Sequence, residues 1–198
     1  MFYWFTWFFV KVIRGLFFPI RVYGIEHIPS KGAFILASNH RSYLDPMIIP
    51  ILIKRRISFV AKKSLFDNRL LSWILTHLEA FPIRRGTADF RAIREILSRL
   101  KRGMPVLIFP EGTRLVRQRK QKVQAGIGMI VAKSSAPIVP VYIDGSDKVL
   151  APGSKFPKRK RVIVRFGKPF HITETVGKSY QEIAEEIMGS IESLARFR

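Results

Sequence analysis

The chain has 198 residues, enough for one substantial domain that buries about 70% of the surface exposed by its unfolded form. It contains no cysteine, which excludes disulfide bonds, thiolate metal sites and a cysteine nucleophile. Thirty-five Lys and Arg residues against fourteen Asp and Glu give a formal charge of +21, so we expect an anionic partner. The sequence has no zinc-finger spacing, RNA-recognition signature or basic leucine zipper. It therefore favours anionic membrane lipids, a phosphorylated acceptor, or a phosphopantetheine carrier or coenzyme A over nucleic acid.

The first twenty residues are rich in Phe and Trp. Lys11 interrupts the apolar run after ten residues, whereas a membrane-spanning helix needs about 20. The pattern predicts a helix that lies in the lipid headgroup region, and the alternative is a helix packed on the protein's own core. We therefore divide the chain into a membrane-interface anchor at 1–20 and one domain at 21–198. No signal-peptide pattern is visible, so we expect the protein at the cytoplasmic face of the cell membrane.

From residue 21 onward, short apolar runs alternate with helical patterns. Strands are predicted at 34–38, 57–61, 79–82, 106–109, 138–143 and 161–166, after a short strand and turn at 22–29. Helices are predicted at 46–53, 69–78, 88–101, 123–134 and 178–196. Within the second helix we assign Trp73 to the core and His77 to the core or a helix end. The alternation predicts an α/β fold with a largely parallel sheet flanked by helices, whose reactive groups gather at the carboxyl ends of the strands.

A polar loop follows the strand predicted at 34–38, and it holds His40 and Asp45. We expect a helix to start at Pro46 with Asp45 as its N-cap, because a residue before proline avoids helical dihedrals. One carboxylate oxygen would bond the backbone and the other the imidazole Nδ1–H, which leaves Nε2 basic. The pair is then a general base for a hydroxyl. The alternative is that Asn39 and Asp45 are only turn and cap residues and that the histidine has no chemical task.

Two arginines, Arg84 and Arg85, follow the strand predicted at 79–82. Their planar guanidinium groups suit a phosphate, which they bind through two hydrogen bonds at once. The alternative for this stretch alone is a solvated edge.

The strand predicted at 106–109 runs directly into Pro-Glu-Gly-Thr-Arg. Gly112 lets the backbone approach a ligand closely and Arg114 adds a cation, so with Thr113 they form a predicted anion-binding turn. A carboxylate is unexpected in such a site. We therefore expect Glu111 either to orient an arginine or to accept a hydrogen bond from an acceptor hydroxyl.

Four stretches together resemble the signature blocks of the glycerolipid acyltransferase family. Residues 39–45 read Asn-His-x-Ser-x-x-Asp and resemble the first block. Residues 81–85 resemble the second block, whose arginine binds the acceptor phosphate. Residues 109–114, Phe-Pro-Glu-Gly-Thr-Arg, match the third block without departure, and residues 136–142 resemble the fourth. Each block occurs once, and the four stand in the family's order.

The resemblance covers roughly residues 22–170 and implies a 1-acylglycerol-3-phosphate O-acyltransferase, which makes phosphatidic acid in phospholipid biosynthesis. It implies that His40 takes the proton of the acceptor hydroxyl while Asp45 holds the imidazole, with acyl-CoA or acyl-ACP as donor and a lysophospholipid as acceptor. The substrate-binding residues would be Arg84, Arg85, Glu111, Gly112, Thr113 and Arg114, with Asn39 and Ser42 in support. Arg85 fits the register of the second block best.

We expect neither a metal nor another cofactor, and no covalent acyl-enzyme because the Gly-x-Ser-x-Gly elbow is missing. Two alternatives stay open. One is an acyltransferase for another lysolipid. The other is a non-catalytic basic protein that binds membrane or nucleic acid through its charge.

Overall fold

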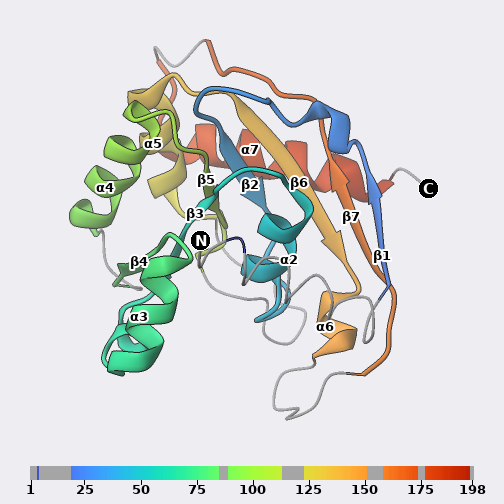
Figure 1. The fold of residues 1–198 in the computed structure, drawn as a ribbon. Helices are drawn as coiled ribbons and strands as arrows, with labels where there is room; N and C mark the ends of the chain where they lie inside the picture. The colour runs from blue at the N-terminus through green and yellow to red at the C-terminus, as the bar shows by residue number, and fades with distance from the viewer. Residues whose placement is uncertain are drawn as a thin grey trace.

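Strands and helices alternate along the chain in the computed structural model, which describes residues 4, 19–84, 89–112, 123–150, 158–173 and 177–196 (Figure 1). The strands are β1 (Ile20–Tyr23), β2 (Ile35–Ser38), β3 (Ser58–Lys62), β4 (Ala80–Ile83), β5 (Val106–Ile108), β6 (Ile138–Asp144) and β7 (Val162–Phe166). The α-helices are α2 (Asp45–Leu52), α3 (Arg69–His77), α4 (Phe90–Lys101), α5 (Ala125–Ser134), α6 (Ser146–Val149) and α7 (Tyr180–Ser193). Short 3₁₀ turns are η1 (Ile25–His27), η2 (Lys63–Phe66) and η3 (Leu194–Arg196). Each helix and strand predicted from residue 34 onward is present, and the boundaries differ by at most a few residues.

The strands form one sheet in the order β1-β7-β6-β2-β5-β3-β4. The five strands from β6 to β4 run parallel to one another, whereas β7 is antiparallel to β6 and parallel to β1. The prediction of a largely parallel α/β sheet is therefore confirmed. The two strands at one side of the sheet, β1 and β7, run in the opposite direction to the other five. As a result, the carboxyl ends of β2, β3, β4, β5 and β6 meet along one edge of the sheet.

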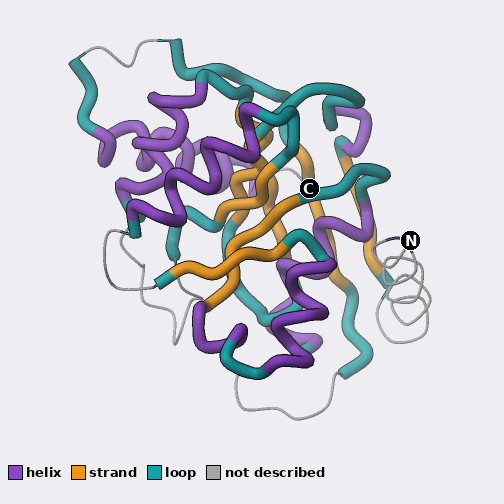
Figure 2. Tube along the Cα trace, turned by 60° about the vertical axis from the view of Figure 1, so that its left-hand side comes forward, coloured by secondary structure: helices purple, strands orange, loops and turns teal. Residues whose placement is uncertain are grey.

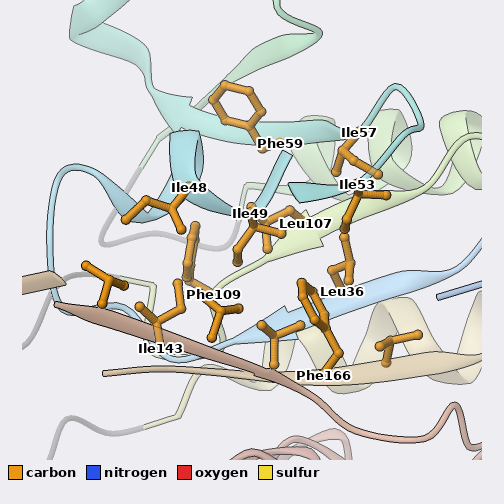
Figure 3. Packing of buried hydrophobic residues seen from close by; sticks show 14 of the residues in the cluster. Leu36, Ile48, Ile49, Ile53, Ile57, Phe59, Leu107, Phe109, Ile143 and Phe166 are labelled. Atoms are coloured by element: carbon orange, nitrogen blue, oxygen red, sulfur yellow. The ribbon is translucent and has the colours of Figure 1, made fainter. Parts of the chain in front are cut away.

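The sheet is covered on both faces (Figure 2). Successive side chains of a strand point to opposite faces, and Leu36 of β2 belongs to the same buried cluster as Ile48 and Ile49 of α2 (Figure 3). Its neighbours Ile35 and Ala37 pack with residues of α4, α5 and α7 on the other face. Burial on both faces explains why this strand is an uninterrupted apolar run.

Helices α5 and α7 approach each other closely at Gly128. A Cβ atom at this position would overlap the backbone carbonyl of Tyr180 at the start of α7, so only glycine fits. The contact holds the beginning of α7 against α5.

In the part of the chain that the structure describes, no helix is both long and apolar enough to span a membrane. The anchor predicted for residues 1–20 lies almost wholly outside the described residues.

Candidate active site

The loop between β2 and α2 brings His40 and Asp45 together at the carboxyl edge of the sheet. His40 Nδ1 lies 2.9 Å from Asp45 Oδ2, and both side chains are buried, with 4% and 0% of the residue exposed. The hydrogen bond predicted between these two residues is present. A turn through the intervening residues makes it possible, because a continuous helix would separate the two side chains by roughly 140°.

The structure corrects the predicted role of Asp45 in helix capping. Leu44 is the N-cap of α2, it makes no side-chain capping bond, and Asp45 is the first helical residue. A single oxygen, Oδ2, accepts the hydrogen bond from the imidazole. The same oxygen also accepts hydrogen bonds from the backbone N–H groups of Arg41 and Ser42, each at 2.7 Å. Within the described residues Oδ1 has no hydrogen-bond partner, so the prediction that the two oxygens divide these bonds is wrong. The loop folds back over one oxygen, which fixes the backbone and the imidazole together.

The hydrogen-bond pattern sets the tautomer of His40. Because the ionised carboxylate can only accept hydrogen bonds, the contact with Asp45 places the ring proton on Nδ1 and leaves the lone pair on Nε2. The ring of Phe109, which follows β5, stacks on the imidazole with centroids 4.2 Å apart and planes inclined by 23°. The imidazole is therefore held on its edge by a carboxylate and on its face by an aromatic ring.

Asn39 attaches the same loop to strand β6. Its side-chain amide donates to the carbonyl of Ile143 at 2.8 Å, and its Oδ1 accepts the N–H of Ile143 at 2.7 Å. The side-chain amide thus makes the two hydrogen bonds that a backbone peptide group of a neighbouring strand would make, and it continues the β2–β6 ladder beyond Ser38. Ser42 supports the turn, since its hydroxyl accepts the N–H of Leu44 at 3.3 Å and donates to the carbonyl of Leu150 at 3.5 Å.

Glu111, which follows β5, reaches the histidine from the other side. Its Oε2 accepts the backbone N–H of His40 at 2.8 Å, a contact different from either role we predicted for this carboxyl group. Burial raises the pKa of Glu111 to about 7, although the bond from His40 opposes the shift, and the nearby charge of Asp45 adds to it. The third block is in this way coupled to the backbone of the first.

A cavity of about 640 Å³ adjoins these residues, a size typical of small-molecule sites. His40, Glu111, Gly112 and Arg84 all line it. Gly112 has φ 67°, a left-handed backbone conformation that favours glycine. Aliphatic side chains of α4 and α5 form another part of the wall, namely Ala92, Ile93, Ile96, Ile127, Met129 and Ile130.

Arg84 lies at the end of β4, where its backbone N–H donates to Asp89 Oδ2 at 2.8 Å. Asp89 also caps α4 by accepting the N–H groups of Arg91 and Ala92, and these backbone bonds, led by the one from Arg84, lower its pKa. The other predicted substrate-binding residues, Arg85, Thr113 and Arg114, lie outside the described residues.

Sequence reasoning missed several parts of this site. The stacking of Phe109 on His40 joins residues 69 positions apart, and Tyr180, which also lines the cavity, lies in the last helix. The family blocks place Phe109 beside the turn at Glu111, which was the one local signal for it. For Tyr180 and the aliphatic wall the sequence carries only ordinary helical periodicity.

The family model described as Acyltransferase matches residues 19–144, well over half of the chain. The chain belongs to the acyltransferase family. This confirms the resemblance carried by the four blocks. The acyltransferase is 29% identical over 163 residues to the 1-acyl-sn-glycerol-3-phosphate acyltransferase of Bacillus subtilis (strain 168), a match that covers 82% of this chain and 79% of the relative.

Two further comparisons agree. The acyltransferase is 29% identical over 171 residues to the 1-acyl-sn-glycerol-3-phosphate acyltransferase of Streptococcus pneumoniae, covering 85% of this chain and 61% of the relative. Its fold is similar to the crystal structure of the 1-acyl-sn-glycerophosphate (LPA) acyltransferase PlsC from Thermotoga maritima, with a TM-score of 0.73 and 25% identity. That match covers 91% of this chain and 73% of the other.

Proposed function

We propose that this acyltransferase moves a fatty acyl group from an acyl thioester to the free hydroxyl of 1-acylglycerol-3-phosphate, giving phosphatidic acid. The observation that carries the proposal is a buried histidine, hydrogen-bonded to a buried carboxylate, on the wall of a cavity that also holds Arg84. The names of the relatives support the choice of acceptor.

In the proposed reaction, His40 Nε2 accepts the proton of the acceptor hydroxyl as its oxygen attacks the thioester carbonyl carbon. A carbon–oxygen bond forms and the carbon–sulfur bond then breaks. The imidazolium returns its proton to the departing thiolate, so the enzyme ends the cycle unchanged. Asp45 stabilises the imidazolium between the two transfers, and no acyl-enzyme, metal ion or redox cofactor takes part.

We assign the acceptor phosphate to the cationic side of the cavity, at Arg84 and the two arginines predicted to accompany it, Arg85 and Arg114. The turn at Glu111 to Gly112, with Thr113, completes the proposed substrate-binding group. The aliphatic wall from α4 and α5 suits an acyl chain, because burying methylene groups there is favourable by about 0.8 kcal/mol each. The donor is acyl-CoA or acyl-ACP, and we place the enzyme at the cytoplasmic face of the membrane.

The test is product analysis by mass spectrometry after incubation of the purified chain with an acyl thioester and matched lysolipids. Two acceptors should carry the same acyl chain, one with a phosphate monoester and the other with a diester headgroup. We expect the monoester to be converted to the diacyl product, with no change on addition of EDTA. Acylation of the diester alone would point to another lysolipid acceptor. Failure with every acceptor, together with salt-sensitive binding that His40→Ala leaves unchanged, would support the non-catalytic alternative.

A further inference from the structure

The helix α3 differs from the other long helices because it buries no residue completely. It packs on the core through Leu75, and the preceding turn η2 packs through Phe66. We assigned Trp73 to the core, and this prediction is wrong, since 49% of the residue is exposed. His77 is the last residue of α3, as expected for a helix-end role, and its ring contacts Trp73 at 4.3 Å between centroids.

The outward side of this segment is also apolar. Leu70 is 68% exposed and Leu65 of η2 is 41% exposed, and both lie close in sequence to Trp73. A helix that is apolar on its inner and outer sides is normally covered on both. Asn68 fixes the start of the helix, because its Oδ1 accepts the N–H of Leu71 at 3.0 Å, so the exposed side chains stand on an ordered element.

Exposed cations lie along the same segment as these side chains. Lys62, Lys63 and Arg69 are exposed along the same segment, which carries one acidic residue, Asp67. We define the η2–α3 surface as Lys62, Lys63, Leu65, Arg69, Leu70 and Trp73. Exposed leucines and a tryptophan interleaved with cations are the composition that binds the interface of an anionic bilayer.

The η2–α3 surface lies near the cavity that His40 lines. Lys62, the last residue of β3, pairs in register with Ile83 of β4, at the carboxyl edge of the sheet. Ile83 and the adjacent Arg84 line the cavity beside His40. In Figure 1, α3 stands next to β4 at the end of the molecule where α2 also lies. A bilayer on this surface would therefore adjoin the wall of the cavity.

We propose that the η2–α3 surface docks on an anionic lipid bilayer, as a membrane contact separate from residues 1–20. A second copy of the chain is a poor occupant, because two molecules with a formal charge of +21 repel each other. The proposal concerns membrane binding alone. It can therefore fail while the proposed acyl transfer holds, and it can hold while the proposed acyl transfer fails.

A chain in which Trp73 is the sole tryptophan tests the contact directly. The sequence has three tryptophans, so Trp4→Phe with Trp7→Phe in the full chain leaves Trp73 as the only indole. The probe is a vesicle of phosphatidylglycerol and phosphatidylcholine in equal parts, with or without brominated acyl chains. We expect the emission of Trp73 to shift to the blue on binding and to be quenched by bromine. Vesicle flotation with unshifted, unquenched emission would overturn the proposal, as would failure to bind these vesicles.

Substitutions provide a second, independent measurement. Leu65→Ser with Leu70→Ser should lower the partition coefficient on these vesicles about tenfold, since the two exposed fractions add to roughly one leucine side chain. The matched control is Tyr23→Ser with Ile25→Ser, two residues of similar exposure at the other end of the sheet, and it should leave the partition coefficient unchanged. Circular dichroism checks the fold of both variants. Equal partition coefficients for the leucine variant and the control variant would contradict the proposal. Dissociation of an oligomer by the leucine substitutions would also contradict it, because that result would identify a second copy of the chain as the occupant.

The cations give a third readout. Lys62→Gln and Lys63→Gln should each weaken binding to the anionic vesicles about fivefold and leave binding to pure phosphatidylcholine unchanged. An equal loss on both kinds of vesicle would remove the electrostatic part of the proposal.

Discussion

The sharpest test of the site is Asp45→Asn, which removes a charge and keeps the shape of the side chain. The amide oxygen can occupy the position of Oδ2 and accept the same three hydrogens, from His40 Nδ1 and from the backbone of Arg41 and Ser42. The reverse orientation would point an NH₂ group at three N–H donors. The variant therefore keeps the tautomer of the histidine and loses the negative charge that balances the imidazolium.

Asp45→Asn should change both the free energy of unfolding and the rate of acyl transfer. The amide NH₂ comes to the position of Oδ1, which has no hydrogen-bond partner within the described residues, so we expect a destabilisation of about 1–3 kcal/mol. The rate should fall much further. If the carboxylate charge is needed for base catalysis, kcat/KM drops about 10²-fold or more.

The assay compares kcat/KM for acyl transfer and the urea midpoint of Asp45→Asn and Asp45→Ala with those of the parent chain. Alanine also deprives two backbone N–H groups of their acceptor, so its urea midpoint should be the lower of the two. An Asp45→Asn enzyme that stays folded and keeps its kcat/KM within about threefold of the parent would refute the role of the charge.

Three further changes test other parts of the structure. Since the folded pKa of Glu111 is raised from 4.5 to about 7, the folded state binds the extra proton, and the parent loses up to about 3 kcal/mol of stability between pH 4.5 and 7. Glu111→Gln cannot titrate, so its stability relative to the parent should rise with pH. If urea unfolding gives the same difference in unfolding free energy between variant and parent at pH 5 and at pH 8, the prediction is contradicted. Gly128→Ala places a Cβ against the carbonyl of Tyr180 and should lower the melting temperature by several degrees, whereas Gly126→Ala on the same helix, with open space around it, should not. Asn39→Ala leaves the N–H and C=O of Ile143 without their partner and should cost about 2 kcal/mol or more in unfolding free energy; a change below 0.5 kcal/mol would mean that the loop is held elsewhere.

Local patterns in the sequence predicted much of the fold. The strands at the centre of the sheet are apolar runs, because both of their faces are covered, and turn residues separate them from the helices. The reversal of β7 relative to β6 has no such local signal. The direction of β7 depends on the path by which the chain returns to the side of the sheet. The residue types of the strand do not determine that path.

The candidate site was predicted unevenly for similar reasons. His40 and Asp45 are five residues apart, and Pro46 indicated that a turn lies between them. The bond from His40 N–H to Glu111 spans 71 residues and could only be seen in three dimensions. Trp73 was misplaced because its helix is apolar on two sides, and sequence periodicity alone does not identify the side that faces the core.

Replacement of His40 by alanine tests the central claim most directly. If this imidazole is the general base, turnover of an acyl thioester and 1-acylglycerol-3-phosphate should fall about 10²-fold or more, while the urea midpoint and vesicle binding stay close to those of the parent. An alanine variant that is folded, membrane-bound and as fast as the parent would contradict the account.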